Sequence, residues 1–145
     1  MADCYTNFSL IMALPDVAAR TYALELHGRM EEHRDDEDRP DDIPESLWEQ
    51  REDWCLEVDP SGETSLWLHS SSGGIDAVCA FIQHLLRQHG LMEAVGFEWS
   101  HDCSKPCTDA YGGGAAFITA QNIRTYTTGE WLSRQTQRHR RLNLR

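Results

Sequence analysis

The fold is decided by residues 95–119, VGFEWSHDCSKPCTDAYGGGAAFIT. The first six residues alternate apolar and polar side chains, which predicts a strand with Val95, Phe97 and Trp99 on one face. The opposite face of that strand carries Gly96, Glu98 and Ser100. A loop rich in Cys, Pro and Asp follows, and after three consecutive glycines residues 115–119 predict a second strand. The stretch therefore predicts two strands of one sheet, which the rest of the chain must complete.

The chain upstream predicts an alternation of strands and helices. Asp-Pro-Ser-Gly at residues 59–62 places Pro and Gly where a hairpin turn favours them. In order, the expected elements are a strand at 7–14, a helix at 16–30, strands at 54–58 and 64–69, a helix at 75–86, and strands at 95–100 and 115–119. Thr127 and Glu130 then match a capping box, which predicts a short last helix carrying Trp131 and Leu132.

This order of elements predicts an α+β protein with the ferredoxin-like split βαβ arrangement, β-α-β-β-α-β. In that arrangement two helices cover one face of a four-stranded antiparallel sheet, and the strand at 115–119 and the last helix are additions to it. The sequence predicts one domain at residues 1–132, with an acidic insertion at 31–53. Residues 133–145 show no apolar face, and we expect them to form a frayed basic tail.

The formal net charge of the 145-residue chain is −11, from 13 basic and 24 acidic residues. Five of the arginines follow residue 131, so residues 1–131 contain eight basic and 24 acidic residues and carry a formal charge of −16. Such a body repels nucleic acid and anionic membranes and attracts basic partners. We therefore expect a basic protein or nucleoprotein complex as partner, with no direct nucleic-acid binding by the body.

Two observations predict a cytoplasmic protein. The first residues, MADCYTNFSL, lack the basic and apolar regions of a secretory signal, and no apolar run is long enough to span a bilayer. Cysteines in a reducing compartment stay as thiols. We therefore expect five free thiols, at Cys4, Cys55, Cys79, Cys103 and Cys107.

The acidic insertion is the first candidate site. Pro40 and Pro44 exclude one continuous helix through it, which leaves two interpretations: a mobile solvated loop, or an acidic contact surface for a basic partner. Trp67 alternates with Leu66 and Leu68, so it should lie on the sheet face that the helices leave open, either as an exposed anchor or beneath an added element. The candidate partner-binding residues are Glu31, Glu32, Asp35, Asp36, Glu37, Asp38, Asp41, Asp42, Glu45 and Trp67.

The loop between residues 98 and 114 is the alternative site, for a small ligand or for catalysis. Its reactive or charged residues are Glu98, His101, Cys103, Lys105 and Asp109. A zinc site would combine His101, Cys103 and Cys107, with His69 from the hairpin, but this spacing is not one of the usual zinc motifs. His101 and Lys105 favour a thiolate at Cys103, yet the sequence identifies no base and orienting group to complete a nucleophile.

The three glycines at 112–114 offer no phosphate site. They precede a strand and lack the Lys and Ser/Thr of a phosphate loop, so close backbone packing or a positive φ at the strand entry is the favoured interpretation. Acidic pairs such as Glu98 and Asp109 have no independent support as an acid/base pair. We therefore expect no catalytic residue, no metal and no cofactor.

The segment GFEWSHDCSKPCTDAYGGGAAFIT, with TTGEWL after it, resembles a group of small acidic proteins encoded by phages and mobile elements. In that group a GFEW strand leads to a Cys-Ser-Lys-Pro loop, a Gly-rich turn and a terminal Trp-Leu. The resemblance rests on Gly96, Phe97, Glu98, Trp99, Cys103, Ser104, Lys105, Pro106, Gly112, Gly113, Gly114, Trp131 and Leu132. It implies a mobile-element setting, where small acidic proteins often inhibit host systems that handle nucleic acid, and it implies no catalytic activity.

Three functions remain open on the sequence. The leading one is a non-enzymatic inhibitor whose acidic surface docks on the basic nucleic-acid-binding groove of a host defence or DNA-processing complex, where carboxylates imitate phosphate charge. The alternative is a small-ligand binder or enzyme that uses the loop at 98–114. The third is a nucleic-acid contact through the arginines of residues 134–145. The open sheet face would also suit a homodimer.

Overall fold

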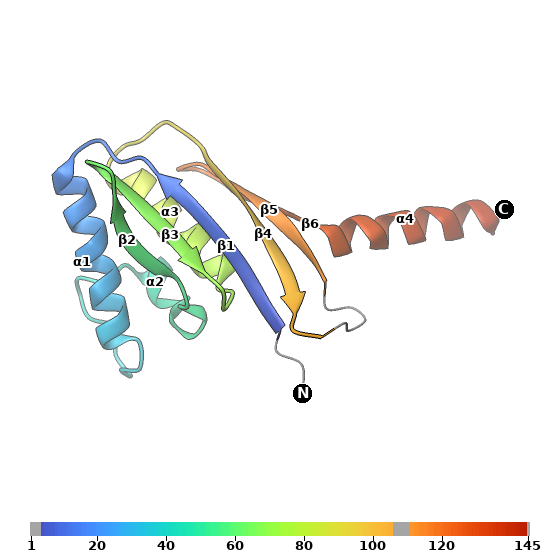
Figure 1. Ribbon diagram of the computed structural model, residues 1–145, viewed down its shortest axis with the longest axis horizontal. Helices are drawn as coiled ribbons and strands as arrows, with labels where there is room; N and C mark the ends of the chain where they lie inside the picture. The colour runs from blue at the N-terminus through green and yellow to red at the C-terminus, as the bar shows by residue number, and fades with distance from the viewer. Residues whose placement is uncertain (1–3, 106–110, 145) are drawn as a thin grey trace.

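The computed structural model describes residues 4–105 and 111–144, which form one six-stranded antiparallel sheet with four α-helices (Figure 1). The first half of the chain contains β1 (Cys4–Met12), α1 (Val17–His33), α2 (Glu45–Trp48), a 3-10 turn at Arg51–Asp53, β2 (Glu57–Ser61) and β3 (Ser65–Ser70). The second half contains α3 (Ile75–Gln88), β4 (Val95–Cys103), β5 (Gly112–Ile118), β6 (Ile123–Thr127) and α4 (Thr128–Asn143). The expected α+β class is confirmed.

The strand order is β2-β3-β1-β4-β5-β6, and every neighbouring pair is antiparallel. The sequence predicted five strands, and β6 is the sixth. The predicted hairpin turn at 59–62 is wrong, because β2 continues to Ser61 and the turn follows it, with Gly62 at φ +57°. Pro60 pairs with Leu66 inside β2. A proline is tolerated there because β2 is an edge strand, whose outward backbone needs no N–H donor.

One face of the sheet is covered by helices and forms the core. Alternate strand residues such as Phe8, Leu68 and Phe97 are buried in a single cluster with the apolar stripes of α1 and α3. In α3 the buried residues recur at helical spacing from Ala77 to Leu86, as the sequence predicted. Because successive strand residues point to opposite faces, the other face of the sheet carries the intervening residues and no helix lies over it (Figure 1).

The glycines at the start of β5 serve backbone geometry, as expected. Gly112 has φ +125°, which side chains rarely adopt. A Cβ at Gly114 would collide with the indole of Trp99 on β4. The glycines therefore let β5 approach β4 closely over a large buried side chain.

The last helix begins as the sequence predicted and then departs from the prediction. The Thr127 hydroxyl accepts a hydrogen bond from the Glu130 amide at 3.1 Å, which caps α4. The expectation of a frayed tail after residue 132 is wrong, because α4 continues to Asn143. Residues 130–143 contain no Pro or Gly, and Arg, Gln and Leu are good helix formers. The helix projects beyond the edge of the sheet (Figure 1), and none of its side chains is buried. Among the described residues, no helix is long and apolar enough to cross a membrane.

Candidate functional site

The sheet face opposite the helices, called the open face below, gathers polar and aromatic side chains from all six strands. Its position follows from strand alternation, because its residues intervene between the buried ones. Its residues include Ser9 and Ile11 on β1, Glu57 and Asp59 on β2, Trp67 and His69 on β3, Glu98 on β4, Phe117 on β5, and Arg124 and Tyr126 on β6. Several large apolar side chains there remain about half exposed, among them Ile11 and Phe117.

Trp67 lies on the open face, where alternation predicted it, and its side chain is 40% exposed. Its ring stacks on the imidazole of His69 with a centroid separation of 3.7 Å. Its indole N–H donates a hydrogen bond to the Ser9 hydroxyl at 2.8 Å. No added strand or helix covers Trp67 in the described part of the chain, so it forms a fixed, partly exposed aromatic surface.

His69 lies between two carboxylates of β2. Its Nε2 is 2.7 Å from Asp59 and its Nδ1 is 3.4 Å from Glu57. The cluster therefore places two carboxylates beside an aromatic ring.

Two hollows of the open face meet at Glu98. The first, of about 620 Å³, is polar and lies over β1 to β4, where Ser9, Glu57, His69 and Glu98 line it. The second, of about 500 Å³, lies over β4 to β6 and is lined mainly by carbon, including the side chains of Phe117 and Tyr126. Sequence reasoning missed this grouping, because it depends on the register between strands that are far apart in the chain.

The acidic segment, residues 31–53, is held against the core. Ile43 is completely buried, and Leu47 and Trp48 of α2 are buried beside it. Arg29 of α1 binds both oxygens of Asp42, at 2.6 and 2.9 Å, and this contact lowers the pKa of the Asp42 carboxyl. Residues 34–44 form a loop of turns whose carboxylates are exposed, and Ile43 attaches that loop to the core. The nine predicted contact carboxylates from Glu31 to Glu45 are exposed.

The structure divides the predicted partner-binding set. The carboxylates of the acidic segment lie on the helix side of the sheet, next to α1 and α2, whereas Trp67 lies on the open face. Trp67 therefore joins Glu57, Asp59 and Glu98, none of which the sequence had placed with it.

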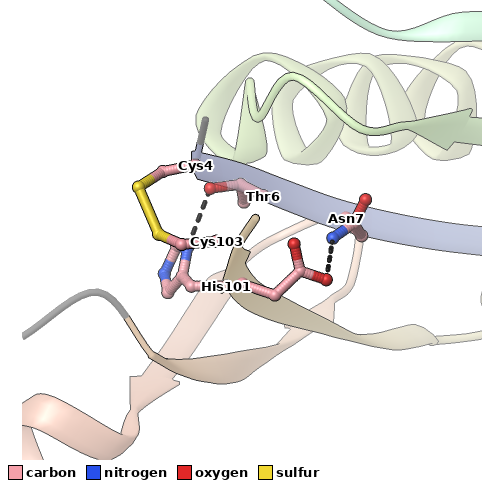
Figure 2. The surroundings of a disulfide bond; sticks show 6 residues. Cys4, Thr6, Asn7, His101 and Cys103 are labelled. Carbon is pink, nitrogen blue, oxygen red and sulfur yellow. Dashed lines mark hydrogen bonds between the residues drawn. A yellow bond between two sulfur atoms is a disulfide. The ribbon is translucent and has the colours of Figure 1, made fainter. Parts of the chain in front are cut away.

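The loop site is also divided, and one of its members is not a thiol. Cys4 and Cys103 lie opposite each other on β1 and β4 and form a disulfide (Figure 2). The expectation of five free thiols is therefore wrong, and a disulfide between residues 99 apart in the sequence could not be inferred without the strand register. Within the described residues, Cys55 and Cys79 are free. Burial raises the pKa of the Cys79 thiol to about 12, so that thiol stays protonated at neutral pH.

Side chains around the disulfide bind neighbouring strands instead of facing a pocket. His101 Nδ1 is 2.8 Å from the Thr6 hydroxyl, and Asn7 donates a hydrogen bond to Asp102 at 3.3 Å (Figure 2). His101 and Glu98 point to opposite faces of β4, because they are three positions apart and successive side chains of a strand alternate between its two faces. Lys105 is exposed, and Asp109 and Cys107 lie outside the described residues.

The arrangement supports neither a thiolate nucleophile nor a metal centre in the part of the chain that is described. While the Cys4–Cys103 disulfide is intact, Cys103 can act neither as a nucleophile nor as a metal ligand. Across residues 4–105 and 111–144, no group of three His, Cys, Asp or Glu side chains converges as metal ligands would. His69 and Cys103 of the hypothetical zinc set are on opposite sheet faces.

Two partly buried histidines pack against core residues. His27 of α1 stacks on Trp54 and accepts the indole N–H on Nδ1 at 3.2 Å. Burial lowers the pKa of His27, against the opposing effect of Glu31, and burial likewise lowers the pKa of His84. Both side chains are therefore held in the neutral form.

Comparisons with protein-family models, with curated proteins and with solved structures found no match to this chain.

Proposed function

We propose that this protein is a non-enzymatic acidic binding protein that docks on the basic, nucleic-acid-binding surface of a host defence or DNA-processing complex and inhibits it. The observation that carries the proposal is the acidic segment, in which exposed carboxylates stand on a backbone anchored by the fully buried Ile43. A preformed surface of negative charge fits a groove that binds phosphates. It also loses little conformational entropy on docking, which favours binding.

The distribution of charge supports a protein partner. Residues 31–53 alone contain twelve acidic residues and three arginines. Opposite charges on two proteins accelerate their encounter, and salt screens this attraction. The proposed complex should therefore form fast and weaken steeply as the salt concentration rises.

We also infer that β1, α1, β2, β3, α3 and β4 form a ferredoxin-like core, to which β5, β6 and α4 are added. The strand order β2-β3-β1-β4 and its antiparallel pairing support this inference. The phage or mobile-element setting rests on the resemblance of the GFEW, Cys-Ser-Lys-Pro and Gly-rich segments. Because the proposed partners act in the cytoplasm, the proposal places this protein there.

The disulfide provides a test of that location. A Cys4–Cys103 bridge persists in oxidising compartments and is reduced in the cytoplasm. Acid quenching of expressing host cells, followed by alkylation of free thiols and mass spectrometry, reports the state of both cysteines. Alkylated Cys4 and Cys103 agree with a cytoplasmic protein, whereas a protected pair would place it in an oxidising compartment.

The function is tested by capture from a host lysate at low salt. One bait is the wild-type chain. The second carries Asp35→Asn, Glu37→Gln, Asp38→Asn and Asp41→Asn, and it keeps Asp36 and Asp42, which bind His33 and Arg29. The matched control removes the same number of exposed carboxylates outside residues 31–53, by Glu25→Gln, Glu63→Gln, Asp76→Asn and Glu93→Gln.

We expect the wild-type and control baits to retain a basic nucleic-acid-binding protein that duplex DNA displaces, and the segment variant to lose at least about tenfold in retention. Equal retention by the two variants would show that the interface lies outside the acidic segment. Capture of no such protein by the wild-type chain would overturn the proposed function.

A further inference from the structure

The basic helix α4 makes few contacts with the rest of the molecule. It spans 16 residues, and none of its side chains is buried. Trp131 is 49% exposed and Leu142 is 63% exposed. An isolated helix of this length is only marginally stable in water unless an amphipathic face packs against something. Packing against another surface would therefore stabilise this helix.

The arginines of α4 form a stripe. Arg134, Arg138 and Arg141 are spaced i, i+4 and i+7, so at 100° per residue they fall within an arc of about 60°. Trp131 and Leu142 lie three turns apart at the edge of this arc. The helix thus presents cationic and apolar side chains to the same side. Arg140 lies about 100° away from Arg141 and outside the stripe.

The open face is complementary to this stripe in charge and in polarity. Its polar hollow is lined by Glu57 and Glu98, and Asp59 lies beside it on the same face. Its second hollow presents the exposed ring of Phe117 next to Tyr126. Guanidinium groups suit the carboxylates of the first hollow, and Trp67 offers an aromatic face beside His69 of its lining. Apolar side chains suit the second.

The dimensions also agree. The 16 residues of α4 extend over about 24 Å, and six strands at a spacing of about 4.8 Å extend over about the same distance. One helix can therefore reach from the apolar hollow over β4 to β6 to the acidic hollow over β1 to β4.

The helix cannot easily reach the open face of its own chain. Its first turn is fixed by the Thr127 cap and by a 3.2 Å hydrogen bond from the Gly113 amide to the Thr128 hydroxyl. From there α4 points away from the sheet edge (Figure 1). Folding back would break these contacts, whereas a second copy can accept the helix as it stands. The charges favour the same occupant, because a body of charge −16 attracts an arginine helix.

We propose that α4 of one copy of this chain docks across the open face of a second copy, and that the exchange is mutual, which gives a two-fold symmetric dimer. Each interface places the Arg134, Arg138 and Arg141 stripe against Glu98, Glu57 and Asp59, with Trp131 over Phe117 and Leu142 at the far end of the face, beside β2. Mutual exchange closes the assembly at two copies. The proposal uses the open face and α4, not the acidic segment, so it and the proposed function can fail separately.

The first measurement is the molar mass of the full-length chain by sedimentation velocity, over a range of protein concentrations. At about 50 mM salt we expect a dimer, and at about 500 mM salt a shift toward monomer, because salt screens the arginine–carboxylate attraction. A monomer at low salt and at every concentration would overturn the proposal. So would a dimer that salt does not weaken.

Neighbouring arginines provide a matched pair of variants. Arg141→Glu reverses a charge within the stripe, and Arg140→Glu makes the same change outside it. Because both side chains are exposed, neither change should unfold the body, which circular dichroism verifies. We expect Arg141→Glu to weaken dimerisation at least about tenfold and Arg140→Glu by less than about threefold. Equal losses would contradict docking by the stripe.

A charge exchange separates docking on a second copy from every other occupant. One chain carries Arg134→Glu, Arg138→Glu and Arg141→Glu, and the other carries Glu57→Lys and Glu98→Lys. Each variant alone sets like charges against each other and should be monomeric. Their mixture restores attraction at both interfaces and should form a one-to-one dimer. A mixture that stays monomeric would overturn the proposal, as would α4 amides protected from hydrogen exchange in a monomer, which would show docking within one chain.

Discussion

Two charged regions of this molecule look alike in sequence and differ in structure. The acidic segment and the basic helix α4 are both rich in charge, and composition alone suggested a mobile loop for the first and a frayed end for the second. The acidic segment is tied to the core by Ile43, Leu47 and Trp48, all buried. Helix α4 buries no side chain at all. Charge composition therefore does not decide whether a segment packs; a few apolar residues at the right positions do.

The same difference gives the two regions different physical roles. A segment anchored by buried side chains presents its carboxylates in fixed positions, which suits recognition of a rigid partner. A helix that buries no side chain and is tied to the sheet at its first turn unfolds locally at low cost. The acidic segment should therefore unfold only with the whole domain, whereas α4 should open independently.

The largest expected effect tests the anchoring directly. Ile43→Ala removes a fully buried side chain and should lower the free energy of unfolding by about 2–4 kcal/mol. Leu142→Ala removes a side chain of similar size from α4, where it is 63% exposed, and should change that free energy by less than about 0.5 kcal/mol. Urea unfolding of dilute protein at high salt measures both. Similar losses for the two variants would abolish the distinction between the regions.

The elements that the sequence predicted are those with strong local periodicity. The alternation around Phe97 identified β4 and its faces, and the spacing from Ile75 identified α3. Trp67 was placed on the open face by the same rule. The sequence predicted the hairpin but placed its turn three residues too early. Asp-Pro-Ser-Gly at residues 59–62 matches the residue preferences of a turn, whereas in the structure β2 continues to Ser61 and the turn begins at Gly62.

The features that the sequence did not predict depend on contacts between distant segments. The Cys4–Cys103 disulfide and the polar hollow at Glu98 follow from the pairing of β1 with β4, and no local pattern reports that pairing. The order of the acidic segment depends on Ile43, a single apolar residue among charges. A single residue gives no periodicity, so propensity rules could not detect it.

The second prediction concerns the acid sensitivity of the packed helices α1 and α3, compared with α4. The pKa of His27 is lowered by burial, so the unfolded chain, with an ordinary histidine pKa of 6.5, takes up the proton first as the pH falls. The free energy of unfolding should therefore decrease between about pH 7 and pH 5, with a further contribution from His84, whose pKa is also lowered. Protonation would also break the hydrogen bond from Trp54 to Nδ1.

Histidine variants on α1 and on α4 distinguish protonation of His27 from a general effect of pH on stability. His27→Gln should flatten the dependence of unfolding free energy on pH, measured by urea unfolding at several pH values. His139→Gln, at an exposed position of α4, should leave the slope unchanged. If both variants flatten the slope equally, protonation of His27 is not its cause.

The third prediction compares helix propensity in a packed helix and in an unpacked one. Gly28 lies in the middle of α1 and is exposed, and a Cβ added there would meet nothing within 4 Å, so Gly28→Ala should raise global stability by about 0.5–1 kcal/mol. Thr136→Ala in α4 gains helix propensity of about 0.5 kcal/mol. Because α4 should open independently, that gain should slow hydrogen exchange within α4 about twofold without shifting the global unfolding transition. A global shift for Thr136→Ala would show that α4 unfolds with the domain.

The smallest expected effect concerns the arginine ties of the acidic segment. Arg29 binds Asp42 with both partners exposed, and surface ion pairs contribute little and are screened by salt. Arg29→Gln should lower the Tm slightly at low salt and not at high salt, whereas Arg140→Gln should leave it unchanged, because no ion pair in the described part of the chain involves α4.

The pKa of Asp42 is lowered below its usual 3.8, so its ion pair with Arg29 stabilises the fold above that pH and is lost as the pH falls through the lowered pKa. The Tm difference between wild type and Asp42→Asn should therefore shrink below pH 3.8. A difference that persists in acid, or in high salt, would mean that Asp42 acts through packing, and the anchoring of the segment would then rest on more than Ile43 and its apolar neighbours.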